Sequence, residues 1–278
     1  MIYRFLTMTK FFIYHTVKSR AFLFMVFLNA VISILIASIM FISPVLLKSF
    51  VPGNIQVNGL PEILVKRLFN FQWANIMIYI PVLSSAFFGS TAIPYEYERG
   101  TIYNLSSLPV DRFQILMSKI TGATVLSFLS TSVIVVFQIL FFVIIFKSLP
   151  GSKFLFYILL LLLVTFSDVC FAVAVSVFFN NSGHSAIAFL IVYLVIMNII
   201  SLIATGTHFI SPIFVKTNTD RVIYRVFINA DPYFLKYSFS LSPMALPGIE
   251  YTSGILLLYS FSALIVAYAV FSFRRNFS

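Results

Sequence analysis

The chain has 278 residues, of which 60% are hydrophobic and only 9% are charged, and its formal net charge is +10. A soluble domain carries about 25% charged residues, so this composition excludes a soluble domain and indicates an integral membrane protein. The 18 Lys and Arg residues flank apolar runs rather than cluster, which favours anchoring at a membrane surface over nucleic-acid binding. The sequence therefore predicts a single all-α transmembrane domain over residues 1–278.

Residues 1–20 mix apolar side chains with four basic ones, Arg4, Lys10, Lys18 and Arg20. This pattern is typical of a helix that lies at the membrane interface. The alternative is a frayed basic lead-in to the first span. A cleavable signal peptide is not expected, because the first apolar run is too long for one.

Six apolar runs reach the length of about 20 residues that crosses a bilayer. They are residues 21–47, 70–93, 118–146, 154–179, 185–209 and 252–273. An even number of spans places both termini on the same side. Lys and Arg are equally numerous in the segments on the two sides, so the positive-inside rule does not decide the orientation. The four basic residues ahead of the first span favour a cytoplasmic N-terminus.

A polar segment, residues 94–112, separates the second and third spans. Pro94 is expected to end the second span. Ile102, Leu105 and Leu108 then recur at helical spacing, which predicts a short amphipathic helix that ends at Pro109. Beyond it, Asp111 and Gln114 form a variant of the capping box, which predicts that the third helix starts at Arg112.

The pattern E-x-E-R-G-T-x-x-x-L-x-x-L-P-V-x-R in this segment, followed by Ile115 and Lys119, resembles the membrane subunits of ABC transporters of the type-two exporter family. The resemblance extends over the whole length of the chain. It implies a cytoplasmic coupling helix that transmits the movement of two separate ATPase subunits to the spans. The coupling interface that it implies consists of Glu96, Glu98, Arg99, Gly100, Thr101, Leu105, Leu108, Pro109 and Arg112.

The chain itself carries no phosphate-binding loop, no paired cysteines and no metalloprotease or nucleophile-elbow motif. We therefore expect no enzyme activity, no catalytic or metal site and no cofactor in this chain, with ATP and Mg²⁺ bound by the partner ATPase. The resemblance further implies a multi-pass protein of the plasma membrane with cytoplasmic termini. It also implies a dimer, formed with a second copy or with a related permease.

Residues 210–251 are expected to form an external segment of short helices that are half-buried at the outer interface, with Asp231-Pro232 as one helix start. An ordinary ordered loop is the alternative.

Polar residues follow one face of two spans. They are Asn198, Ser201, Thr205 and His208 in span five, and Gln72, Asn75 and Tyr79 in span two. Polar groups in a span normally face protein or water, and in similar permeases these spans line the cavity at the dimer interface. Asn75, Tyr79, Asn198, Ser201 and Thr205 are therefore candidates for a substrate path. Plain helix packing is the alternative.

Asp168 is the one acidic residue deep in a predicted span, on a face shared with Thr165 and Ser176. An intramembrane carboxylate indicates a proton, cation or substrate site. The alternative is a neutral carboxyl group held by neighbouring Ser or Thr hydroxyls, and the sequence shows no relay partner for a proton.

The predicted function is that of a permease subunit in an ATP-driven exporter. A membrane anchor that transmits ATPase movement without transport is a second hypothesis, and a secondary transporter is a third. Many secondary transporters consist of two repeated halves, and the spans of this chain show no obvious repeat of that kind. The substrate does not follow from the sequence.

Overall fold

The computed structural model describes residues 2–42, 62–101, 110–207, 214–228 and 249–273, and these are helical almost throughout, with no strand among them. Within these residues, six helical stretches are long and apolar enough to cross a membrane. This confirms the predicted all-α, six-span membrane fold.

The first half of the chain contains α1 (Ile2–Val17), α2 (Arg20–Ile42), α4 (Glu62–Ile76), α5 (Tyr79–Phe88), α6 (Pro94–Glu98) and α8 (Arg112–Phe146). The second half contains α9 (Lys153–Ser176), α10 (Ser182–Ile191), a π-helical turn η2 (Val192–Ile196), α11 (Met197–Thr207), α12 (Lys216–Asp220), α13 (Val222–Ile228) and α15 (Ile249–Phe273). Spans two and five are composite, formed by α4–α5 and by α10–η2–α11.

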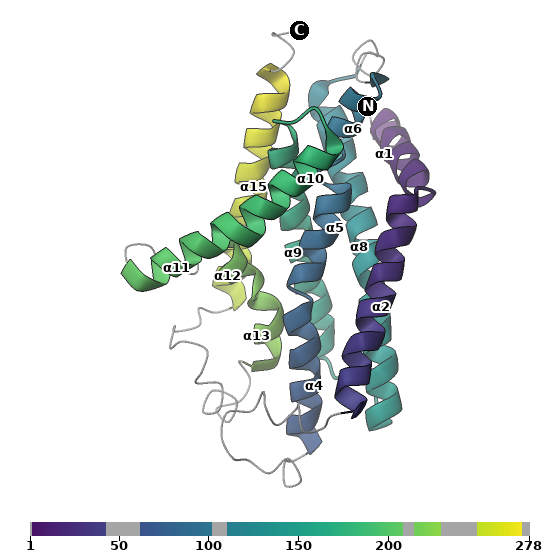
Figure 1. Cartoon of the computed structure of the whole chain (residues 1–278), viewed down its shortest axis with the longest axis vertical. Helices are drawn as coiled ribbons and strands as arrows, with labels where there is room; N and C mark the ends of the chain where they lie inside the picture. The colour runs from purple at the N-terminus through teal and green to yellow at the C-terminus, as the bar shows by residue number, and fades with distance from the viewer. Residues whose placement is uncertain (1, 43–61, 102–109, 208–213, 229–248, 274–278) are drawn as a thin grey trace.

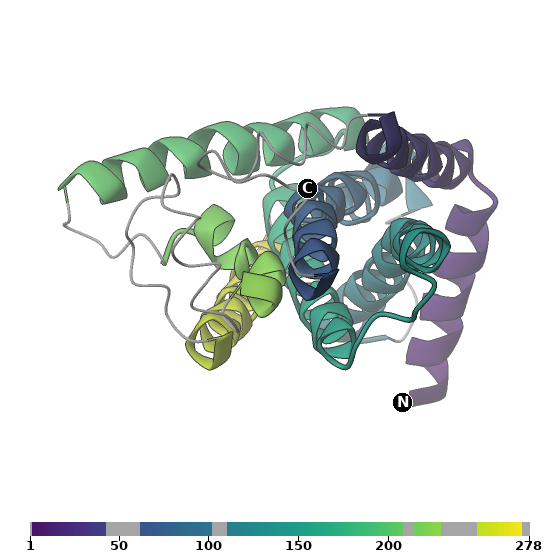
Figure 2. The ribbon, with the colours of Figure 1, turned by 90° about the horizontal axis from the view of Figure 1, so that it is seen from below.

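Helix α9 lies at the centre of the bundle, where it packs against α5, α8 and α15 (Figure 2). Its buried side chains Tyr157, Leu161 and Val164 share one core with Trp73 of α4. By contrast, the helix formed by α10, η2 and α11 extends away from the other spans (Figure 1). Most of its apolar side chains are exposed, for example Leu202, which leaves this face open to lipid or to another protein.

Span two is interrupted between α4 and α5, and a proline explains the break. Pro81, in the first turn of α5, has no N–H group to donate to the carbonyl of Met77, so the α-helical pattern cannot run unbroken through this point. The prediction that Pro94 ends the span is wrong. Helix α5 already ends at Phe88, and Pro94 is the first residue of α6, where its missing N–H group has no helical partner to lose.

The third helix begins at Arg112, as predicted, although the side chain of Asp111 makes no capping hydrogen bond. Its 35 residues correspond to about 52 Å at 1.5 Å per residue. This exceeds the hydrocarbon thickness of about 30 Å. The helix therefore extends beyond the bilayer, and it carries α1 on its surface.

Helix α1 confirms that the N-terminal residues are helical; its position at a membrane interface stays a prediction. It packs against α8 and lies at the end of the bundle where α6 is found and α15 ends (Figure 1). A Cβ atom at Gly122 would lie 2.5 Å from Cδ1 of Phe12, so the absence of a side chain at Gly122 permits this packing. The hydroxyl groups of Thr9 and Thr121 lie 3.4 Å apart across the same contact.

We expect Gly122→Val to displace α1 from α8, because the added side chain would overlap the Phe12 ring. The measurement is disulfide formation between Thr9→Cys and Thr121→Cys, which should fall several-fold. Gly254→Val is the matched control, since a Cβ atom at Gly254 meets nothing within 4 Å. Equal crosslinking in the Gly122→Val and Gly254→Val variants would show that the packing of α1 on α8 does not depend on the close approach at Gly122.

Candidate functional site

The polar segment after span two turns sharply at Gly100. Helix α6 ends at Glu98, and Gly100 has φ +66°, a left-handed conformation that favours glycine. The backbone N–H of Gly100 donates to the carbonyl of Tyr97 at 3.1 Å. Leu105, Leu108 and Pro109 lie outside the described residues, so the amphipathic helix stays a prediction.

The two acidic residues of α6 bind other elements of the chain. Glu96 forms an ion pair with Lys119 of α8 and accepts a hydrogen bond from the hydroxyl of Thr101. Glu98 accepts hydrogen bonds from the backbone N–H and the hydroxyl of Ser182, at 2.9 and 2.7 Å. Because Ser182 is the first residue of α10, the carboxylate of Glu98 also complements the helix dipole.

Arg112 provides a further link, since its guanidinium donates to the backbone carbonyl of Ser272 at 2.7 Å. Ser272 lies in the last turn of α15. Glu96 and Glu98 therefore bond the segment to spans three and five, and Arg112, the first residue of span three, bonds that span to span six. The sequence showed these residues as a charged group but not their partners, which lie as far as 160 positions away.

Arg99 differs from its charged neighbours. Its side chain is exposed and lies over the Tyr95 ring, 4.4 Å from the centroid, and it forms no ion pair with any residue that the structure describes. Arg99 also lines a pocket of about 380 Å³ between α1, α5 and α6, with Phe12 and Phe88 among its apolar residues. The segment thus presents an exposed cation beside a pocket that apolar residues line together with polar ones such as Glu96 and Lys119.

The candidate substrate-path residues lie in different settings. Asn75, Tyr79 and Asn198 are exposed, and the amide of Asn198 donates to the carbonyl of Leu194 within its own helix at 2.7 Å. Ser201 is bonded to the Asn218 amide of α12 at 2.7 Å. The side chain of Thr205 and the whole of His208 lie outside the described part of the structure.

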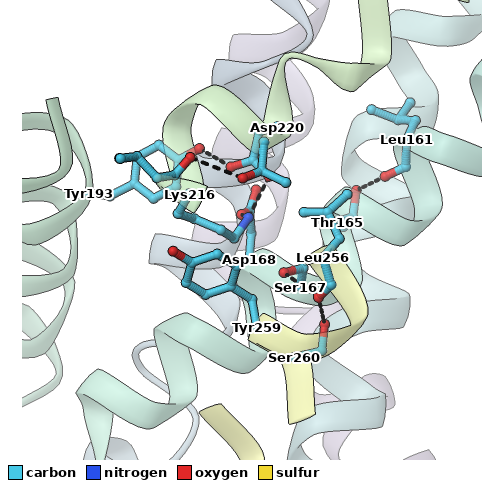
Figure 3. Close-up of polar contacts among 12 residues, drawn as sticks. Leu161, Thr165, Ser167, Asp168, Tyr193, Lys216, Asp220, Leu256, Tyr259 and Ser260 are labelled. Atoms are coloured by element: carbon cyan, nitrogen blue, oxygen red, sulfur yellow. Dashed lines mark hydrogen bonds and ion pairs between the residues drawn. The ribbon is translucent and has the colours of Figure 1, made fainter. Parts of the chain in front are cut away.

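Asp168 belongs to a buried ionic cluster that the sequence did not predict (Figure 3). The Lys216 ammonium lies 2.5 Å from a carboxylate oxygen of Asp168 and 2.5 Å from one of Asp220. The hydroxyl of Tyr193 donates to the other oxygen of Asp220. All four side chains are buried, and they come from α9, α12 and η2.

The alternative that neighbouring hydroxyls hold Asp168 does not apply. The hydroxyl of Thr165 donates to the carbonyl of Leu161 at 2.7 Å, and the hydroxyl of Ser167 donates to the carbonyl of Leu256 at 3.4 Å. Lys216 falls within residues 210–251, the expected external segment, yet it is fully buried. The one available signal was the i, i+4 spacing of Lys216 and Asp220, which places both on one side of a helix.

Helix α12 therefore differs from the expected half-buried helix at an outer interface. Residues 216–220 are all buried, and α12 packs against α11 and α15. The carbonyl of Phe214, just before α12, accepts a hydrogen bond from Tyr259 of α15. Because Asp168 lies well inside α9, at least a helical turn from either end, α12 must enter the bundle to reach it.

The fold and these contacts define a multi-pass membrane protein whose spans are joined at one end by a charged segment and, within the bundle, by an ionic cluster. A family model described as ABC-2 family transporter protein matches residues 28–198, more than half of the chain. The chain belongs to this family, and it is a membrane permease component that associates with ABC ATPase subunits. None of the curated proteins compared with the chain matches it in sequence.

Proposed function

We propose that the chain is the permease of an ATP-driven exporter in the plasma membrane, working as a dimer with two ATPase subunits and with both termini in the cytoplasm. The observation that supports this best is the bonding of the segment around α6. Movement of this segment would pull on span three through Glu96 and on span five through Glu98, and span three would pass the movement to span six through Arg112.

ATP and Mg²⁺ would be bound by the partner, whose closure moves the coupling helix. In this chain, Arg99 is suited to bind an acidic group of the partner, because an exposed guanidinium forms charge-assisted hydrogen bonds with carboxylates. The adjacent pocket would accept an apolar side chain of the same partner. The spans would then alternate between inward-open and outward-open arrangements.

The exposed face of span five supports the dimer. Asn198 and several large apolar residues are exposed on it, and Asn75 and Tyr79 are exposed on span two. A second membrane subunit packed against these faces would place the polar side chains along an enclosed path. An anchor without transport activity would not need polar residues there.

The test is co-purification of the tagged chain from native membranes in mild detergent. We expect a soluble protein with a phosphate-binding loop to co-purify, and Arg99→Glu to weaken its binding about 10- to 100-fold, as lost charged hydrogen bonds of 1.5–3 kcal/mol imply. Lys153→Glu is the matched control, because Lys153 is an exposed cation at the start of α9 that does not line this pocket.

Recovery of the chain alone, with transport that continues without ATP, would contradict the proposal and favour a secondary transporter. If the Arg99→Glu variant bound the ATPase as tightly as the wild-type chain does, the proposed coupling role of Arg99 would be wrong.

A further inference from the structure

The ionic cluster contains two carboxyl groups and one amino group. Two carboxylates, Asp168 and Asp220, share the single ammonium of Lys216. In addition, the second oxygen of Asp168 is buried and accepts no hydrogen bond. A buried carboxylate oxygen without a donor is costly, so this site has the capacity to bind another donor.

The geometry around Lys216 is that of an ammonium site. Its Nζ atom contacts one oxygen of each carboxylate, and it lies 5.9 Å from the centroid of the Tyr193 ring. Carboxylates on two sides and an aromatic face on a third are the groups that bind primary ammonium ions in proteins. Spans four and five supply Asp168 and Tyr193, whereas α12 supplies both Lys216 and Asp220.

The site adjoins the candidate substrate path. Asn218, two residues after Lys216, is bonded to Ser201 of span five, so α12 covers this path residue while Lys216 occupies the site. Helix α12 has only five residues, held by these side-chain bonds and by packing against α11 and α15. Its withdrawal would expose Ser201, Tyr193 and Asp168 together.

We propose that Asp168 and Tyr193, with Asp220, bind a primary ammonium group of the transported substrate, and that Lys216 is an internal competitor that occupies this site when α12 is docked. The inference rests on the proposed function, since it names the chemistry of the substrate. It assigns two roles to Lys216, which stabilises the site while α12 is docked and is displaced by the ammonium group of the substrate.

The test uses n-propylammonium, which replaces the atoms that Lys216→Ala removes beyond Cβ and is protonated at neutral pH, as a lysine side chain is. Thermal unfolding of the purified full-length chain is measured with propylammonium chloride, with potassium chloride and with 1-propanol. We expect saturable stabilisation of Lys216→Ala by propylammonium alone. Asp168→Asn added to Lys216→Ala should weaken this binding at least 10-fold, and the wild-type chain should require far more amine because Lys216 competes.

Lys216→Ala combined with Asp220→Asn is the second variant if Lys216→Ala alone does not fold, because it keeps the space for the amine and removes one uncompensated carboxylate. If neither variant folds, both are expressed with propylammonium or with 1-propanol in the medium. We expect the amine, and not the alcohol, to restore the yield of folded protein. Equal effects of amine and alcohol, or no saturable effect, would overturn the proposal. The assay contains no ATPase, so its failure with intact ATPase co-purification would leave the proposed function standing.

Discussion

Lys216→Met is expected to lower the free energy of unfolding by about 3–5 kcal/mol, the usual cost of removing one partner from a buried ion pair. The substitution keeps an apolar side chain of similar length but leaves Asp168 and Asp220 buried without their cation. The loss is measured by denaturant or thermal unfolding of the purified chain in detergent.

Two further variants show whether charge causes this loss. Lys153→Met changes an exposed lysine at the start of α9 and should stay within about 0.5 kcal/mol of wild type. Adding Asp168→Asn to Lys216→Met removes one of the two uncompensated carboxylates, so it should restore part of the stability. Similar small losses for the two lysine variants would show that the cluster does not stabilise the fold.

Gly89→Leu is expected to destabilise the bundle by about 1–3 kcal/mol through overpacking. A Cβ atom at Gly89 would lie 2.9 Å from the carbonyl oxygen of Ser85 and 3.0 Å from the Cβ atom of Ala172. Helix α5 can therefore approach α9 this closely only because residue 89 has no side chain.

The matched control for this position is Gly254→Leu, in a helix with open space around residue 254. Midpoints of thermal unfolding should fall for Gly89→Leu and stay unchanged or rise for the control. A midpoint for Gly89→Leu equal to that of wild type would mean that α5 and α9 can separate at no cost.

The spans were predictable because a long apolar run needs no knowledge of its neighbours to be stable in lipid. The start of α8 at Arg112 was also predictable, from the local Pro109 and Asp111 signals. The break between α4 and α5 was not predicted, although Pro81 was visible, because a proline inside an apolar run does not by itself show whether the helix bends or stops.

The buried cluster was beyond the reach of the sequence for a physical reason. A lysine in a segment between spans indicates a loop, since burying it is costly unless it is paired. The pairing that makes burial possible joins Lys216 to Asp168, 48 positions away. Glu98 is a similar case, because its partner Ser182 is 84 positions away. Local patterns thus indicated which residues were unusual, and the fold showed what they contact.

The measurement that tests the central claim most directly is photocrosslinking in native membranes, with a photoreactive amino acid placed at position 99 or 149. Arg99 lies in the segment that we propose contacts the ATPase, whereas Leu149, 77% exposed, follows α8 at the far end of the bundle (Figure 1). We predict an adduct with a phosphate-loop ATPase from position 99 and none from position 149. An ATPase adduct from position 149 alone would contradict the account, because the partner would then bind the opposite end of the molecule.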